Sequence, residues 1–195
     1  MRPKLLLACT LAAATLLLTG CLVPERFTAR VQVQPDAAYS YRFDGTAVNA
    51  IAIMKLRKQG VLSEKDHQGL VAEAEQLGRD PDVKKAVYKG NARYLLEMEG
   101  KREPGQSLKL LDMLTVQTDA DGVMTIAAKL LTDKELNELE QLGITVNGTL
   151  LVSLPQNAEV IAQNASTTPA PGQPSYRWKI GPPGALPEIK IRIKR

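Results

Sequence analysis

The chain has 195 residues, with 25 Lys or Arg against 21 Asp or Glu, and a formal net charge of +4. The charges are mixed along the chain and aromatic residues make up only 4%, so the composition excludes a typical nucleic-acid-binding protein. The cysteines, Cys9 and Cys21, both lie near the N-terminus. The rest of the chain therefore has no internal disulfide and no thiol nucleophile, and its fold depends on burial of apolar side chains.

The first residues have the pattern of an export signal. Arg2 and Lys4 precede an uncharged run over residues 5–18, which is shorter than the about 20 residues that a membrane-spanning helix needs. The end of this run, Leu18-Thr19-Gly20-Cys21, resembles the lipobox of bacterial lipoproteins, Leu-x-Gly-Cys. The resemblance implies a signal peptide over residues 1–20 and lipidation of Cys21. An ordinary secretory signal and a short uncleaved anchor are the alternatives.

The lipobox resemblance also implies a place in the cell. Acyl chains such as palmitate on Cys21 give the chain a membrane partner and a position in the cell envelope. Because Leu22 rather than Asp follows the cysteine, the resemblance implies the outer membrane, facing the periplasm, with the outer face of the cell membrane as the alternative. We expect residues 22–26 to form a short tether and residues 27–195 a single extracytoplasmic domain.

The first half of this domain begins with strand-like alternation and continues with helical spacing. Ser63 and Asp66 form a capping box in which Asp replaces Glu. The region around residue 51 is predicted as a helix, with a continued strand as the alternative because two isoleucines are β-branched. The predicted elements are strands at 27–34 and 39–43, helices at 48–60 and 63–78, and strands at 83–88 and 92–99.

The second half returns mainly to strands. Residues 108–117 carry apolar side chains on both faces, as in a central strand covered by helices. Asp119 and Asp121 lack the further ligands of a calcium-binding loop, so a hairpin turn is favoured. Thr132 begins a full capping box. The predicted elements are strands at 108–117 and 123–130, a helix at 132–142, a strand at 144–154, a loop at 163–175, and strands at 176–180 and 188–194.

These elements indicate an α+β fold, with a largely antiparallel sheet of about eight strands and three inserted helices. Within them, residues 146–155 and Val160, followed by Asn164-Ala165 and Trp178, resemble the C-terminal half of LppM-type lipoprotein domains. Gln156 departs from the pattern, since the family often has glycine there. The resemblance implies lipid binding or an interaction within the envelope.

Residues suited to catalysis or metal binding are few. His67 is the sole histidine and lies one helical turn after Glu64, with no second histidine or free thiol to complete a metal site. Glu97 and Glu99 lie on one face of a strand, about 7 Å apart, a pair that glycosidase chemistry uses. Paired acids on a solvent-exposed face are far commoner. We therefore expect a non-enzymatic envelope lipoprotein without cofactors, which binds a lipid or another apolar or amphiphilic ligand, or an envelope protein. An envelope hydrolase using Glu97 and Glu99 is the alternative.

The last predicted strand has two distinct faces. Ile189, Ile191 and Ile193 are expected to face the core. The basic residues between them project from the other face. They either protect an edge strand from pairing with other chains or steer the domain toward anionic lipid headgroups. These basic residues are Lys190, Arg192 and Lys194, followed by Arg195.

Overall fold

The computed structural model describes residues 22–129, 132–181 and 186–194. The predicted signal peptide and the predicted lipidation site, Cys21, therefore lie outside the described residues. The first described residue is Leu22, directly after that cysteine.

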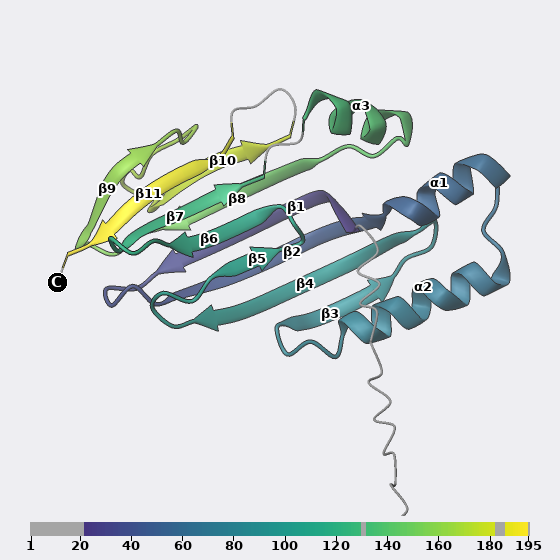
Figure 1. Cartoon of the computed structure of the whole chain (residues 1–195), viewed down its shortest axis with the longest axis horizontal. Helices are drawn as coiled ribbons and strands as arrows, with labels where there is room; N and C mark the ends of the chain where they lie inside the picture. Colours follow the sequence, from purple (N-terminus) through teal and green to yellow (C-terminus); the bar gives the residue numbers. More distant parts are fainter. Residues whose placement is uncertain (1–21, 130–131, 182–185, 195) are drawn as a thin grey trace, which may run out of the picture.

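Six strands form one sheet in the order β10-β8-β1-β2-β4-β3 (Figure 1). Neighbouring strands are antiparallel except for β1 and β8, which run parallel. The parallel pair brings the last third of the chain back beside the first strand. The bounds are β1 (Leu22–Val33), β2 (Tyr39–Asn49), β3 (Val83–Tyr88), β4 (Arg93–Arg102), β8 (Asn147–Ser153) and β10 (Ser175–Ile180).

Five further strands form a second sheet in the order β5-β6-β7-β11-β9, which is antiparallel throughout. Figure 1 shows this sheet lying across the first one. The bounds are β5 (Leu108–Leu110), β6 (Leu114–Thr118), β7 (Val123–Ala128), β9 (Ala158–Gln163) and β11 (Glu188–Ile193).

The two sheets share one hydrophobic core. Alternation along β2 turns Tyr39, Tyr41 and Phe43 inward, where they join the isoleucines of β7 and β11 in a single buried cluster. The opposite face of the six-stranded sheet carries polar residues and is open to solvent. The predicted α+β class is confirmed, but the described residues form eleven strands in two sheets instead of one sheet of about eight strands.

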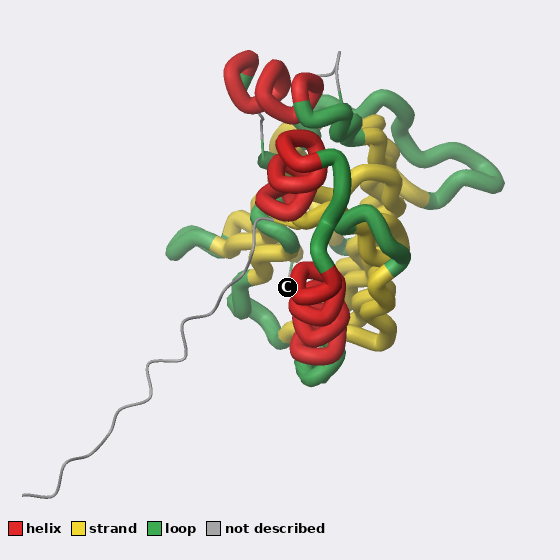
Figure 2. Tube along the Cα trace, turned by 90° about the vertical axis from the view of Figure 1, so that its right-hand side faces the viewer, coloured by secondary structure: helices red, strands yellow, loops and turns green. Residues whose placement is uncertain are grey.

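The three predicted helices are present and lie toward one end of the sandwich (Figures 1 and 2). The capping boxes at Ser63 and Thr132 form as predicted, because each needs only residues within one turn. The first helix ends at Gly60, whose left-handed φ of 78° stops the helical hydrogen bonds. The helices are α1 (Ala50–Gln59), α2 (Glu64–Leu77) and α3 (Asp133–Gln141).

The segment expected to be a tether is part of a strand. β1 begins at Leu22, and its first residues pair with the end of β2, Leu22 with Asn49 and Pro24 with Ala47. The register shifts between Pro24 and Arg26, and the pairing of β1 with β2 resumes at Arg26 and Thr46. Residues 22–26 are therefore strand and not tether, because the long β2 strand supplies backbone partners for all of them except Glu25.

Two further differences concern strand pairing. Residues 108–117 do not form one central strand, because Leu111 and Asp112 adopt left-handed φ angles of 47° and 52° and reverse the chain between β5 and β6. The terminal strand is not an edge, since β11 pairs with β7 on one side and β9 on the other. The protection of an edge is thus the wrong explanation for the basic residues of β11.

Candidate functional site

The open face of the six-stranded sheet is the most strongly charged surface that the strands build. Each strand contributes the polar half of its alternating pattern, and the registers place these side chains side by side. We call this surface the open face. Its basic residues are Arg26, Arg30, Arg42, Lys85, Arg93, Lys101, Arg177 and Lys179, and its acidic residues are Asp44, Glu97, Glu99 and Glu25, which pairs with Arg93.

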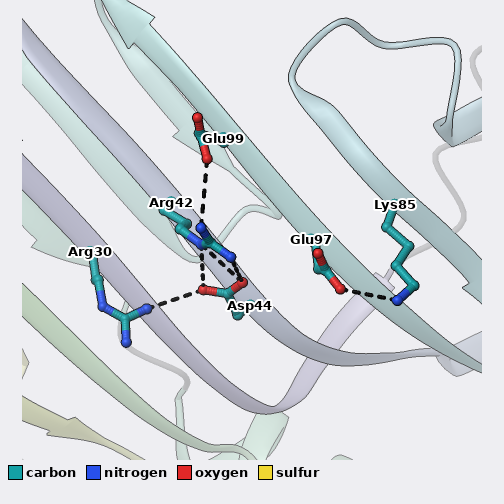
Figure 3. A network of polar contacts seen from close by, with 6 residues as sticks. All are labelled: Arg30, Arg42, Asp44, Lys85, Glu97 and Glu99. Carbon is teal, nitrogen blue, oxygen red and sulfur yellow. Dashed lines mark hydrogen bonds and ion pairs between the residues drawn. The ribbon is translucent and has the colours of Figure 1, made fainter.

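The centre of the open face is a network of ion pairs (Figure 3). Asp44 accepts hydrogen bonds from Arg42 through Nε at 2.9 Å and Nη2 at 2.9 Å, and from Arg30 through Nη1 at 3.1 Å. The hydrogen bonds from Arg42, aided by the charge of Arg30, hold the pKa of Asp44 below its ordinary value. The carboxylate stays ionised at neutral pH and holds two guanidinium groups in place.

A shallow depression of about 580 Å³ lies over this network, lined by Thr28, Arg30, Arg42 and Asp44. A second depression, of about 650 Å³, lies away from the open face and is lined by Arg102, Gly105, Gln106 and Ser107. Polar side chains line both depressions. Between the sheets, large side chains such as Trp178, Leu150 and Ile126 fill the core. Neither depression is an apolar lipid cavity.

Four cations of the open face have no carboxylate within 4.0 Å in the part of the chain that the structure describes. Arg177 and Lys179 lie on the edge strand β10, where the register places them beside Leu151 and Thr149 of β8. Arg26 and Lys101 lie on β1 and β4. Within the described residues, the positive charge of these side chains is uncompensated, and it spans the sheet from β10 to β4.

The structure places Glu97 and Glu99 on the open face but does not assemble them into a catalytic pair. Lys85 contacts Glu97 at 3.2 Å, and Arg42 contacts Glu99 at 3.8 Å. Each carboxylate thus faces a cation of a neighbouring strand, and neither lines the two depressions described above. Glycoside hydrolysis needs a substrate held between two carboxylates, so this geometry gives the hydrolase alternative no support.

His67 and Asp119 have structural partners. Nδ1 of His67 lies 2.8 Å from the hydroxyl of Tyr88. Oδ1 of Asp119 accepts hydrogen bonds from the backbone N–H groups of Asp121 and Val123, both at 2.9 Å, as in the predicted hairpin turn. The described residues contain no group of three His, Cys, Asp or Glu side chains arranged to hold a metal ion.

The residues that the LppM-type resemblance rests on include a contact between the two sheets. Nε1 of Trp178, in β10, donates a hydrogen bond of 2.8 Å to Oδ1 of Asn164, which follows β9. The same oxygen accepts the backbone N–H of Glu188 at 3.0 Å. The Asn and Trp of the motif therefore have a structural role and do not lie on the open face.

Two basic residues of the terminal segment have acidic partners, whereas Arg192 forms no salt bridge within the described residues. Lys190 contacts Glu188 at 3.5 Å, and Lys194 contacts Glu159 at 3.5 Å. The open face, which the sequence did not single out, concentrates more uncompensated positive charge. The available signal was the alternating arginines of the first hairpin, such as Arg26, Arg30 and Arg42.

Comparison with known proteins identifies no family. No family model matches the chain, and no curated protein does. Among solved structures, the chain is similar to the NMR structure of the folded domain of LppM from Mycobacterium tuberculosis, with a TM-score of 0.42 and 13% identity over 88% of this chain and 91% of that chain. These values are too low to assign the chain to that family. Within the described residues, every helix is too short or too polar to cross a bilayer.

Proposed function

We propose that the mature chain is an envelope lipoprotein, anchored through acyl chains on Cys21, that acts as a non-enzymatic binding domain. Its ligand is an acidic envelope protein, which binds to the open face of the six-stranded sheet. The observation that carries this proposal is the excess of basic residues on a face that no element of the described chain covers.

The lipobox sequence supports the anchor, and the described structure adds a consequence. Because β1 begins at Leu22, lipid on Cys21 is attached directly to the end of the sheet with no tether between. Under the lipobox rules its destination is the outer membrane, facing the periplasm. There the twelve-residue strand β1 extends about 36 Å from the anchor, which is long enough to present the open face beyond the lipid headgroups.

The chemistry of the open face favours a protein over an apolar ligand. An apolar ligand needs a cavity lined by hydrophobic side chains, whereas the depression on the open face is lined by threonine, arginine and aspartate. Arginine is enriched at protein interfaces because its planar group binds carboxylates through two hydrogen bonds at once. Arg177 is exposed, and no carboxylate of the described chain pairs with it.

A photocrosslinking experiment in cells tests the proposal. The crosslinking amino acid replaces Thr149, which lies between Thr28 and Lys179 on the open face. The matched control replaces Thr125, which lies between Gln117 and Lys190 on the outer face of the second sheet. We expect a discrete crosslinked protein with an acidic surface segment from position 149 and none from position 125.

Charge variants show whether the basic residues cause the binding. The variant Arg177→Ser/Lys179→Ser removes two uncompensated cations of the open face and should abolish the crosslink. The control Lys109→Ser/Arg192→Ser removes two exposed cations of the second sheet and should leave it unchanged. A crosslink from position 149 to lipid would contradict an acidic protein partner. An equal loss of the protein crosslink in both variants would contradict it as well.

A further inference from the structure

Helix α1 carries an unusually apolar exposed surface. Ile51 is 58% exposed and Met54 is 53% exposed, and Val61, just beyond the end of the helix, is 66% exposed. Ile51, Met54 and Lys58 are spaced at i, i+3 and i+7, which places them on one face of the helix. We call these three residues and Val61 the α1 stripe. Its apolar members are three of the seven exposed large hydrophobic residues of the described chain.

The rest of α1 is fixed to the domain, so the α1 stripe has a defined direction. Ile53 is buried on the opposite side of the helix. The side chain of Asn49 caps the helix by accepting the N–H of Ala52 at 3.0 Å and donates to Glu73 of α2 at 3.0 Å. Lys55 forms an ion pair of 2.5 Å with Asp66 of α2. The exposed side chains thus point away from the core, because the burial of Ile53 and the contacts of Asn49 and Lys55 with α2 hold the helix in place.

The α1 stripe lies beside the point where the predicted lipid anchor joins the domain. Leu22 pairs with Asn49, the residue that caps α1, and Leu22 follows Cys21 directly in the chain. Figure 1 shows the start of β1 and the start of α1 at the same end of the six-stranded sheet. Leu22, to which Cys21 is bonded in the sequence, therefore lies beside the first turn of α1.

The charges of α1 suit an anionic lipid surface. The helix contains Lys55, Arg57 and Lys58 and no acidic residue. Lys58 lies within the α1 stripe, where its long side chain can reach phosphate groups while the neighbouring apolar side chains are buried in lipid. The neighbouring helix α3 carries exposed Glu138 and Glu140, which confines the lipid contact to α1.

We infer that the α1 stripe is a second membrane contact, inserted among the lipid headgroups beside the acylated cysteine. This inference rests on the proposed acylation of Cys21. The acyl chains keep the domain on the membrane, and the α1 stripe sets its orientation by fixing a second point next to the first. The strands then rise from the bilayer, and the open face is directed sideways, accessible to a protein partner.

Fluorescence of the acylated full-length protein, purified from membranes and reconstituted into vesicles of phosphatidylethanolamine and phosphatidylglycerol, tests the contact. Met54→Cys introduces the single free thiol of the mature protein, because Cys9 is removed with the signal and Cys21 is acylated. A polarity-sensitive dye at position 54 should show blue-shifted emission and quenching by lipids with brominated acyl chains. The control is Ile161→Cys, a 48% exposed position on β9 at the other end of the sandwich, where the dye should remain in water.

The outcomes separate the α1 contact from the anchor. The mass of the N-terminal peptide shows whether Cys21 is acylated. If it is acylated and the dye at position 54 behaves like the dye at position 161, the membrane contact of α1 is wrong while the anchor stands. If Cys21 is unmodified, the anchor itself is wrong. As a second measurement, Ile51→Ser/Met54→Ser should abolish the quenching of a dye at Val61→Cys without loss of acylation, and unchanged quenching would also overturn the inference.

Discussion

Arg93 in β4 donates two parallel hydrogen bonds to Glu25 in β1, from Nε to Oε2 at 2.9 Å and from Nη2 to Oε1 at 3.0 Å. The side chain of Glu25 is only 10% exposed. The pair bridges over β2, which lies between these strands in the sheet. It therefore holds the first residues of the domain, directly behind Cys21, as part of the sheet.

Arg93→Ala should destabilise the domain, because it leaves a largely buried carboxylate without its partner. We expect the free energy of unfolding to fall by about 1–3 kcal/mol, as for other buried polar groups left unpaired. Urea unfolding followed by circular dichroism measures the change. The control is Lys101→Ala, which removes an exposed cation of the same strand and should change the stability by less than about 0.5 kcal/mol. Equal effects of the two variants would show that the Glu25 pair does not stabilise the start of β1.

Asn164→Ala should weaken the connection between the two sheets. The substitution removes the oxygen that accepts the Nε1–H of buried Trp178 and the N–H of Glu188, at an expected cost of about 1–3 kcal/mol. Asn164→Asp keeps an acceptor oxygen and should cost less. Trp178 is the only tryptophan, so its fluorescence reports unfolding directly. A variant Asn164→Ala as stable as the wild type would contradict this role.

The capping box of α2 predicts a pH dependence. Hydrogen bonds from Lys55 and from the side chain and backbone of Ser63 lower the pKa of Asp66 from 3.8 to about 2. A carboxyl with a lowered folded pKa stabilises the fold above its unfolded pKa, and this contribution is lost as the pH falls toward 2. Asp66→Asn should therefore reduce the stability at pH 7, and the difference from the wild type should shrink between pH 4 and pH 2.

Urea unfolding of both proteins over this pH range measures the difference. The control is Glu64→Gln, which removes a carboxylate of the same helical turn that accepts a hydrogen bond from Gln68 but takes no part in the capping box. Glu64→Gln should change the free energy of unfolding only slightly over the whole pH range. If the destabilisation by Asp66→Asn is as large at pH 2 as at pH 7, the ionised carboxylate is not its cause.

Asp44→Asn separates stability from binding on the open face. Asp44 is partly exposed, and exposed ion pairs contribute about 0–1 kcal/mol, so the free energy of unfolding should fall by less than about 1 kcal/mol. The substitution releases Arg30 and Arg42 from an intramolecular carboxylate. It should therefore raise the crosslink yield from position 149, because both guanidinium groups become available to an acidic partner. A lower yield in a variant that folds normally would contradict electrostatic recognition.

The elements that the sequence predicted correctly depend on local patterns. The helices α2 and α3 were predicted because Ser63 and Thr132 each form a capping box within one turn. The first hairpin was predicted because its residues alternate with the period of a strand. Local patterns also indicated the turn at Asp119, where one side chain bonds to the next residues of the backbone.

The pairing of distant strands was not predictable in this way. The parallel pairing of β1 with β8 joins Arg26 to Asn147, and β11 lies between β7 and β9. Such registers depend on how whole faces pack, and a short motif does not contain that information. The candidate site was missed for the same reason, because its charged residues come from five strands and only the folded sheet brings Arg30, Asp44 and Lys179 to one face.

We propose that lipid on Cys21 anchors the domain directly at the start of β1, and the mass of the protein extracted from membranes shows whether it does. We expect a protein that begins at Cys21 and carries acyl chains on that residue, and we expect Cys21→Ala to yield either a released protein or an unprocessed precursor. A membrane-bound wild-type protein that begins at another residue, or whose Cys21 carries no lipid, would show that the proposed anchor is wrong.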